Sequence, residues 1–215
     1  PTCIFSLEMS SQQLTDRLLA AESFVDSWKL RTGAIRADEE FARLRDALDT
    51  LAQAPIFIDD EPSNNIMRMK SEARKLKAEH GLGLIVVDYL QLMVPRRETD
   101  SQVQMVTEIS RSLKALAREL EVPVLALSQL SRAVEQRGGK PRLSDLRDSG
   151  SIEQDADVVM FIHREKNEDT NEKHDIAEIL IEKHRNGPTG KIDLVFDGAR
   201  TSFSNMEKGD FGAFS

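Results

Sequence analysis

The stretch Leu84–Asp88, which reads LIVVD, decides the fold class of this 215-residue chain. Its run of apolar residues is typical of a strand that is covered on both faces, as in a parallel sheet. The stretch Pro123–Ser128, which reads PVLALS, predicts a second buried strand, and Gln129 follows it directly. Apolar residues at helical spacing predict a helix from about Val103 to Leu120, between the two strands. Strands that alternate with helices in this way predict an α/β domain with a mainly parallel sheet.

The alternation continues toward both ends of the chain. Further strands are predicted at Cys3–Leu7, Pro55–Asp59, Val158–His163, Ile176–Lys183 and Lys191–Phe196, and further helices after Ser10, over Asp38–Gln53 and over Asn64–His80. Ser10 and Gln13 form a capping box at the start of the first of these helices. The last strands lie too close together in sequence for helices between them, so we expect antiparallel hairpins at that edge of the sheet.

Two polar stretches are not assigned to strands or long helices. Ser131–Gln154 contains Gly138, Gly139 and Gly150, and it is predicted to be a mobile loop. Glu165–Asp175 is almost entirely charged or polar, which predicts an exposed hairpin tip or a disordered loop.

Composition and charge favour a single globular domain over residues 1–215. The hydrophobic content of 40% is enough to bury a core, and no apolar run is long enough to cross a bilayer. Cys3 is the single cysteine and is expected to be a small buried apolar residue. The chain begins without a signal peptide, so we expect a reducing cytoplasm.

The net charge of −8 argues against a surface coated in basic charge for non-specific binding of nucleic acid. Within this acidic chain, the window Gln129–Arg147 carries five basic and two acidic residues, a local net charge of +3. A local basic segment of this kind is compatible with a nucleic-acid contact.

In open α/β sheets ligands bind beyond the carboxyl ends of the strands, which directs attention to Glu8, Asp88 and Gln129. A carboxylate such as Asp88, at the end of a buried strand, can hold Mg²⁺ beside nucleotide phosphates, usually through water, as a Walker B residue does. Aspartate at a strand end also serves as a helix cap or turn residue. On Asp88 alone, both interpretations stay open.

Glu8 and Gln129 each allow a functional and a structural interpretation. Glu8 could orient and polarise the water that attacks a γ-phosphate, or it could complement the N-terminus of the helix that follows it. Gln129 could contact both a γ-phosphate and that water, and so report the state of the nucleotide. Taken by itself, Gln129 is an ordinary polar loop residue.

Lys183 and Arg185 flank one residue at a turn between two late strands, so both side chains point the same way. Both could reach a phosphate, and such an arginine finger can belong to a neighbouring subunit. A solvated cationic hairpin is the alternative interpretation.

The chain resembles the DnaB family of replicative helicases, in which a Glu, an Asp, a Gln and a Lys/Arg pair follow one another in this order. The motor of that family is a RecA-like P-loop NTPase core with a mainly parallel sheet. The resemblance spans nearly the whole chain and rests on the stretches Phe5–Ser10, Ile85–Met93, Ser128–Arg132, Ser144–Asp157 and Lys183–Gly190.

The resemblance implies ATP and Mg²⁺ as the nucleotide and the metal. It makes Glu8 the catalytic base, Asp88 the Walker B magnesium residue and Gln129 the sensor of the γ-phosphate, which passes its signal to the adjoining loop. Lys183 and Arg185 would act in trans, as the piston lysine and the arginine finger at a subunit boundary.

The resemblance also implies partners. Arg147, Asp148 and Gly150 would lie on the loop that follows the backbone of single-stranded DNA through the channel of a homohexamer. The family often has Glu where this chain has Asp148, which keeps the charge and shortens the reach. A primase and a helicase loader are implied as protein partners, and no membrane is.

One family motif is absent from this sequence. No G-x-x-x-x-G-K-[ST] phosphate-binding loop, or Walker A loop, occurs in it. Gly138–Pro141 lacks the first glycine spacing and the hydroxyl residue, and no strand leads directly into it. In the family this loop lies just before the strand that contains Phe5, and a primase-binding domain and linker come earlier still. We therefore expect an N-terminally truncated motor domain that is inactive on its own.

Two rival interpretations stay open. Another RecA-like ATPase, such as a recombinase or a circadian-clock ATPase, would share Glu8 and Asp88, although the stretch Arg147–Gln154 favours the helicase. A non-catalytic assembly or interaction module would keep the fold and would have lost the use of ATP.

Overall fold

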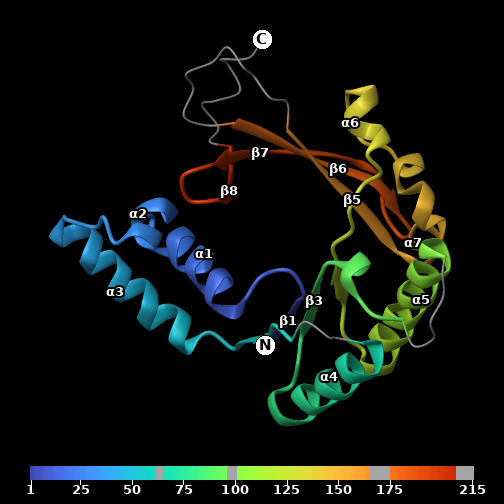
Figure 1. Ribbon diagram of the computed structural model, residues 1–215, viewed down its shortest axis with the longest axis horizontal. Coiled ribbons are helices and arrows are strands. Elements are labelled where there is room, and N and C mark those ends of the chain that lie inside the picture. The colour runs from blue at the N-terminus through green and yellow to red at the C-terminus, as the bar shows by residue number, and fades with distance from the viewer. Residues whose placement is uncertain (62–64, 96–100, 165–174, 207–215) are drawn as a thin grey trace. The chain divides into compact units, whose positions relative to one another are not determined.

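The computed structural model describes residues 1–61, 65–95, 101–164 and 175–206, apart from the side chains of residues 135, 147–149 and 175 (Figure 1). The chain forms two compact units, each with its own sheet. One unit combines Pro1–Leu14 with Gln53–Ala156, and the other combines Thr15–Ala52 with Asp157–Ser215. The single domain predicted over residues 1–215 stays a prediction.

A parallel sheet forms the centre of the first unit. Its strands are β1 (Thr2–Ser6), β2 (Ile56–Asp59), β3 (Leu84–Asp88) and β4 (Val124–Ala126), and they lie in the order β2-β1-β3-β4. Each neighbouring pair is parallel, and the register places Ser6 beside Asp88 and Phe5 beside Asp59. The parallel sheet predicted from the sequence is confirmed, and the carboxyl ends of its strands meet at one edge.

Two helices, α4 (Ile66–His80) and α5 (Gln102–Leu120), cover one face of this sheet, and Figure 1 shows them side by side. Their apolar stripes pack against strand residues in one buried core, because each stripe recurs at the helical period. The core residues that β1, β3, α4 and α5 contribute are Cys3, Phe5, Ile66, Met69, Ala73, Leu76, Ile85, Val87, Ile109, Leu113 and Leu116. The helices predicted for these two stretches are confirmed.

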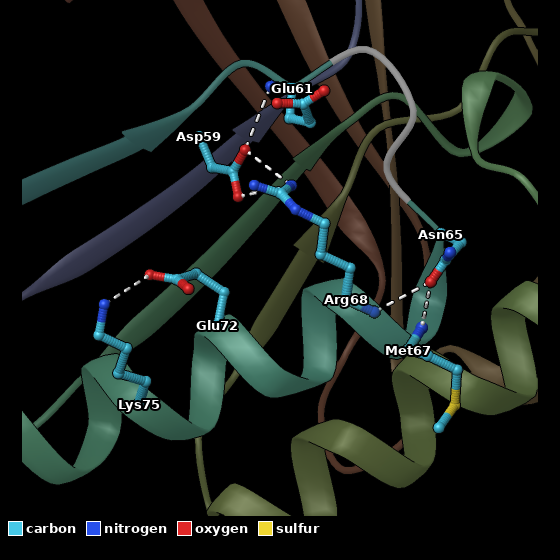
Figure 2. A network of polar contacts seen from close by, with 7 residues as sticks. All are labelled: Asp59, Glu61, Asn65, Met67, Arg68, Glu72 and Lys75. Atoms are coloured by element: carbon cyan, nitrogen blue, oxygen red, sulfur yellow. Dashed lines mark hydrogen bonds and ion pairs between the residues drawn. The ribbon is translucent and has the colours of Figure 1, made fainter.

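Polar contacts fix the start of α4 at the carboxyl end of β2. Asn65 caps the helix, because its Oδ1 accepts the backbone N–H groups of Met67 and Arg68, each at 3.0 Å. The guanidinium of Arg68 donates to Asp59 at 3.1 Å, and the backbone N–H of Glu61 donates to the same carboxylate oxygen (Figure 2). Asp59 therefore holds α4 at this edge of the sheet.

The strands β3 and β4 are less completely covered than the sequence predicts. In β3, Ile85 and Val87 are fully buried, but the residues that alternate with them are only partly buried. In β4, Leu125 is 44% exposed, and Leu127 just beyond the strand is 41% exposed. The prediction that both faces are covered is wrong for these residues, because α4 and α5 pack on one face and β4 lies at the edge of its sheet.

The stretch Ser131–Gln154, predicted as a mobile loop, contains short helices. They are α6 (Ala133–Arg137), the 3-10 helix η2 (Leu143–Ser149) and α7 (Gly150–Asp155). The prediction is wrong because Gly150 does not interrupt the helical structure. Its φ of −53° and ψ of −23° are right-handed helical angles. Polar contacts that join residues distant in sequence hold these helices, as described below.

The second unit contains helices and an antiparallel sheet. The helices are α1 (Ser11–Ser23), which begins in the first unit, α2 (Ser27–Thr32) and α3 (Asp38–Gln53), and Leu19, Val25, Leu44 and Ala47 form a small core. The strands β5 (Val158–Arg164), β6 (Asp175–His184), β7 (Gly190–Asp197) and β8 (Ser202–Asn205) pair in chain order. The predicted antiparallel hairpins are confirmed, with β8 as an addition, but they form a sheet of their own and not the edge of the parallel one. Residues 165–174 of the predicted polar loop lie outside the described residues.

The thiol of Cys3 lies in the core of the first unit. Cys3 has no exposed surface, and burial, together with the carboxylates of Asp59 and Glu72, raises the pKa of its thiol to about 12. The prediction of a buried, apolar cysteine is confirmed. Within the described ranges, none of the helices has the length and apolar composition that spanning a membrane requires.

Candidate functional site

Backbone hydrogen bonds tie together the segments that leave β1, β3 and β4. The N–H of Leu7 donates to the carbonyl of Asp88 at 2.8 Å, and the N–H of Leu127 donates to the carbonyl of Val87 at 2.9 Å. The N–H of Leu90 donates back to the carbonyl of Leu127 at 3.0 Å. These bonds join the chain just beyond each strand, so Glu8, Asp88 and Gln129 all belong to one edge of the parallel sheet.

Glu8 lies in the tight connection between β1 and α1 and is exposed to solvent. The hydroxyl of Ser6 donates to the carbonyl of Met9 at 2.7 Å and fixes this turn. The predicted capping box then begins α1: the N–H of Ser10 donates to Gln13 Oε1 at 3.1 Å, and the N–H of Gln13 donates to Ser10 Oγ at 3.3 Å. Because the turn is held on both sides, the backbone of Glu8 has a defined place beside the sheet.

Asp88 is the last residue of β3 and is partly buried. Among the described residues, no group of three or more His, Cys, Asp or Glu side chains could hold a metal ion without other ligands. A single carboxylate is still suited to Mg²⁺, because this ion usually keeps several waters and is bound through one or two carboxylates and the phosphates of a substrate. The chemistry of Asp88 therefore fits the predicted metal.

Gln129 lies beyond β4 and is exposed, and a glutamine that the sequence did not single out holds its backbone. The N–H of Gln129 donates to Gln91 Oε1 at 3.3 Å, and Gln91 Nε2 donates to the hydroxyl of Ser128 at 2.9 Å. Gln91 lies in the 3-10 helix η1 (Leu90–Leu92), directly after β3. The signal that could have found Gln91 is its place three residues after Asp88, in a stretch that carries the family resemblance.

A small cavity of about 90 Å³ opens beside these two glutamines. Its lining comes from η1, from the start of α5, from the segment after β4 and from η2. The residues that line it are Gln91, Gln102, Val106, Gln129, Leu130, Ser131, Asp145 and Leu146. Its volume exceeds the roughly 10–15 Å³ that one water needs, so water can enter between these segments.

A buried carboxylate, that of Asp145, holds together the segment from Ser131 to Asp145. Asp145 is 6% exposed and accepts two hydrogen bonds of 2.8 Å from the guanidinium of Arg137. Its Oδ2 also accepts the N–H of Arg142 at 2.7 Å, and its backbone carbonyl accepts the N–H of Ser131 at 3.2 Å. The hydrogen bonds from Arg137 lower the pKa of Asp145 below its usual value, and the same contact raises the pKa of Arg137. The segment is therefore a closed loop, held by charge-assisted hydrogen bonds.

Loss of the charge on Asp145 is expected to open this loop. The contribution of the ion pair is fully present above the ordinary aspartate pKa of about 3.9 and is lost as the pH falls through the lowered pKa of folded Asp145. At neutral pH, Asp145→Asn imitates the protonated form. Trypsin should then cleave after Arg137 and Arg142 several-fold faster than in the wild type.

The matched control is Asp46→Asn, which removes a carboxylate whose side chain is 76% exposed and should leave cleavage unchanged. Wild-type protein at a pH below the lowered pKa should show the same opening by a protease that is active in acid. Equal cleavage of Asp145→Asn and wild type would show that Arg137 does not hold the loop.

The predicted DNA-binding residues lie on η2 and at the start of α7. Arg147 and Asp148 belong to η2, with side chains outside the described residues, and Gly150 is exposed at the first position of α7. Polar contacts fasten α7 to α5: the hydroxyl of Thr107 donates to that of Ser151 at 3.0 Å, and the hydroxyl of Ser110 donates to Asp155 at 2.8 Å. The segment is thus anchored after Gly150 as well as at Asp145.

Lys183 and Arg185 belong to the second unit, at the end of β6 and just beyond it. The guanidinium of Arg185 lies 3.3 Å from the carboxylate of Asp157, and its backbone N–H donates to the carbonyl of Asp157 at 2.8 Å. Both side chains of this pair are about half exposed. In the turn to β7, a Cβ on Gly187 would come within 2.7 Å of the ring of His184, so a larger residue there would displace this exposed side chain. The structure brings Glu8, Asp88 and Gln129 to one sheet edge, and it places these cations on a separate hairpin.

Comparisons with known proteins agree with this fold. The DnaB-like helicase C terminal domain family matches residues 1–205. The replicative DNA helicase DnaB of Geobacillus stearothermophilus is 52% identical over 209 residues, which cover 95% of this chain and 46% of that protein. The replicative DNA helicase DnaB of Rickettsia typhi is 46% identical over 228 residues, with 97% of this chain and 46% of that protein covered. The chain spans about half the length of the curated relatives that it matches.

Solved structures support the same assignment. One solved ATPase domain has a TM-score of 0.89 at 37% identity, covering 96% of this chain and 74% of that one. A DnaB-like replicative helicase, solved in a study of its interactions with primase, has a TM-score of 0.90 at 37% identity. The match covers 96% of this chain and 50% of that one. A KaiC-like protein from Pyrococcus horikoshii shares the fold alone. Its TM-score is 0.58 at 14% identity, over 96% of this chain and 76% of that one. The predicted RecA-like fold is confirmed, and the chain belongs to the DnaB-like helicase C terminal domain family.

Proposed function

We propose that this chain is the motor of a replicative DNA helicase, which couples ATP hydrolysis to movement along single-stranded DNA and to unwinding of the duplex. Residues 1–215 are part of one motor domain of that helicase, which acts in the cytoplasm. The observation that carries the proposal is that Glu8, Asp88 and Gln129 meet at the carboxyl edge of one parallel sheet, in a chain that belongs to a helicase domain family.

At this edge each polar residue has one role. Asp88 holds Mg²⁺, which when bound neutralises charge on the nucleotide phosphates. Glu8, exposed beside the end of β1, orients the attacking water and accepts its proton. Gln129 contacts the γ-phosphate through its amide, and its backbone connects directly to the loop closed by Asp145.

Arg185 and Lys183 serve the nucleotide site of a neighbouring subunit in a homohexamer. The half-exposed guanidinium of Arg185, paired with Asp157 at the surface, supports this role, because its planar fork can exchange a carboxylate for a phosphate. A primase and a helicase loader are the proposed protein partners. One similar solved structure is that of a DnaB-like replicative helicase, described together with its interactions with primase, which supports the first of these partners.

The test uses the full-length protein that contains this chain. It should hydrolyse ATP faster when single-stranded DNA is present and should separate the strands of a forked duplex in an ATP-dependent reaction. A folded protein that hydrolyses no ATP, with or without DNA, would refute the motor and would favour a non-catalytic interaction module.

The DNA contact is proposed to grip phosphates and not bases. The sequence from Gln129 to Val159 has no aromatic residue on which a base could stack. It has a local excess of basic residues, and Gly150 is exposed, where it lets a phosphate approach the backbone closely. Phosphate contacts carry no sequence information, which suits a motor that must move along any strand.

Arg147→Ala is expected to weaken the binding of single strands about equally for poly-dT and for mixed sequences. It should also flatten the salt dependence, because each lost phosphate contact removes about 0.7 from the slope of log affinity against log salt. Fluorescence anisotropy across a salt series, with wild type and variant side by side, measures both effects.

Lys75→Ala is the control. Lys75 is exposed on α4, which has the same local excess of five basic over two acidic residues as the window around Arg147. An unchanged slope for Arg147→Ala, or a loss confined to one base composition, would mean that Arg147 only shapes the segment by pairing with a nearby carboxylate such as Glu153.

A further inference from the structure

Gln91 connects two strand ends through one side chain. Its amide oxygen accepts the backbone N–H of Gln129 at 3.3 Å, and its amide nitrogen donates to the hydroxyl of Ser128 at 2.9 Å. Both ends of the amide are therefore engaged with the segment that leaves β4. Because Gln91 lies in η1, immediately after β3, it links the end of the Asp88 strand to the position of Gln129.

The segment held by Gln91 continues into the loop proposed to bind DNA. Two residues after Gln129, the N–H of Ser131 donates to the backbone carbonyl of Asp145 at 3.2 Å. The carboxylate of Asp145 binds Arg137, and Asp145 itself lies in η2, two residues before Arg147. Two hydrogen bonds, joined by the short stretch of chain from Gln129 to Ser131, thus connect η1 at the end of β3 to η2.

The space beside these contacts is not filled by packed side chains. Gln91, Gln129 and Asp145 all line the cavity of about 90 Å³. Gln91 itself is partly buried, whereas Gln129 is exposed. The first residue is suited to act as a fixed anchor, and the second to move against it.

We propose that Gln91 is a positioning residue that makes the affinity for single-stranded DNA depend on the bound nucleotide. It anchors the backbone of Gln129 to the end of β3. When the side-chain amide of Gln129 binds a γ-phosphate, its movement is transmitted through Ser131 to Asp145 and the segment between them. This inference rests on the proposed helicase function and adds a residue to it.

The test is Gln91→Met in the full-length protein. Methionine keeps the length and bulk of glutamine but can make neither hydrogen bond, so the variant removes the anchor and keeps the packing. The readout is the ratio of affinities for single-stranded DNA with a non-hydrolysable ATP analogue and with ADP. Coupling between two binding sites is typically about 5–150-fold, and we expect the variant to reduce this ratio about fivefold or more. DNA stimulation of ATP hydrolysis should fall with it.

Two further variants complete the experiment. Gln102→Met changes the same residue type in the lining of the same cavity and should keep the wild-type ratio. Ser128→Ala removes one of the two anchor contacts from the other side and should give an intermediate ratio. Ser128→Ala keeps the proposal testable even if Gln91→Met does not fold.

The outcomes separate this inference from the proposed function. If the wild type couples nucleotide to DNA affinity, and Gln91→Met and Ser128→Ala both keep the full ratio, the role of Gln91 is overturned and the helicase stands. A lower thermal stability with an unchanged ratio has the same meaning, since it shows a structural role alone. A wild-type protein that neither hydrolyses ATP nor binds single strands refutes the proposed function, and this inference with it.

Discussion

Replacing Arg185 with alanine is expected to lower ATP turnover by the full-length protein about 10³–10⁵-fold, the range by which arginine fingers contribute. The guanidinium would stabilise the charge that develops on the transferred phosphoryl group, and no neutral side chain replaces it. Nucleotide binding should change much less, because the effect acts mainly on the transition state. Steady-state hydrolysis and the equilibrium binding of a nucleotide analogue measure the two quantities separately.

Mixed rings decide whether Arg185 acts on a neighbour. Subunits with Arg185→Ala and subunits with Glu8→Gln should both be inactive alone, but some interfaces between them carry an intact Glu8 and an intact Arg185. Activity should therefore return on mixing. Arg164→Ala, which removes another exposed cation of the same sheet, is the control and should remain active. Verified mixed rings that regain nothing would count against action in trans.

Glu8→Gln is expected to lower turnover about 10²–10⁴-fold, which is the usual contribution of general acid–base catalysis. The amide keeps the size of the carboxylate but cannot accept a proton from the attacking water. Nucleotide affinity should stay close to that of the wild type. Single-turnover hydrolysis, measured at saturating ATP, isolates this step from binding.

A structural role for Glu8 gives a different pattern. If Glu8 only complements the start of α1, Glu8→Gln should lower thermal stability slightly and leave turnover high. Glu22→Gln, at an exposed position on the same helix, is the matched control. A loss that appears mainly in nucleotide affinity would also assign Glu8 to structure and not to catalysis.

The sequence was sufficient to predict the parallel sheet and the edge where the candidate residues meet. Its apolar runs end in polar residues, and the carboxyl ends of parallel strands lie on the same side of a sheet. The capping box of Ser10 and Gln13 was also predictable, because both partners lie within one helical turn. Periodicity and local spacing carry this information directly.

Contacts between residues distant in sequence were not predictable in the same way. Gln91 and Ser128 are 37 residues apart, and a glutamine in an apolar stretch gives no local signal of its partner. The helices between Ser131 and Asp155 were missed because glycines and charges there suggested a loop. Their stability comes from the pairing of Asp145 with Arg137 and from the contacts of α7 with α5. The roles of the individual site residues stay predictions until the variants are measured.

The burial of Cys3 makes this chain convenient for fluorescence work. The thiolate is the nucleophile that attacks thiol-reactive dyes, and a cysteine with no exposed surface and a pKa of about 12 offers essentially none at neutral pH. A cysteine introduced at Ser144, which is exposed in η2, would therefore be the reactive thiol of this chain while Cys3 remains in place. A dye at that position would follow the loop between Gln129 and Arg147 in real time, without any change to the packing of the core.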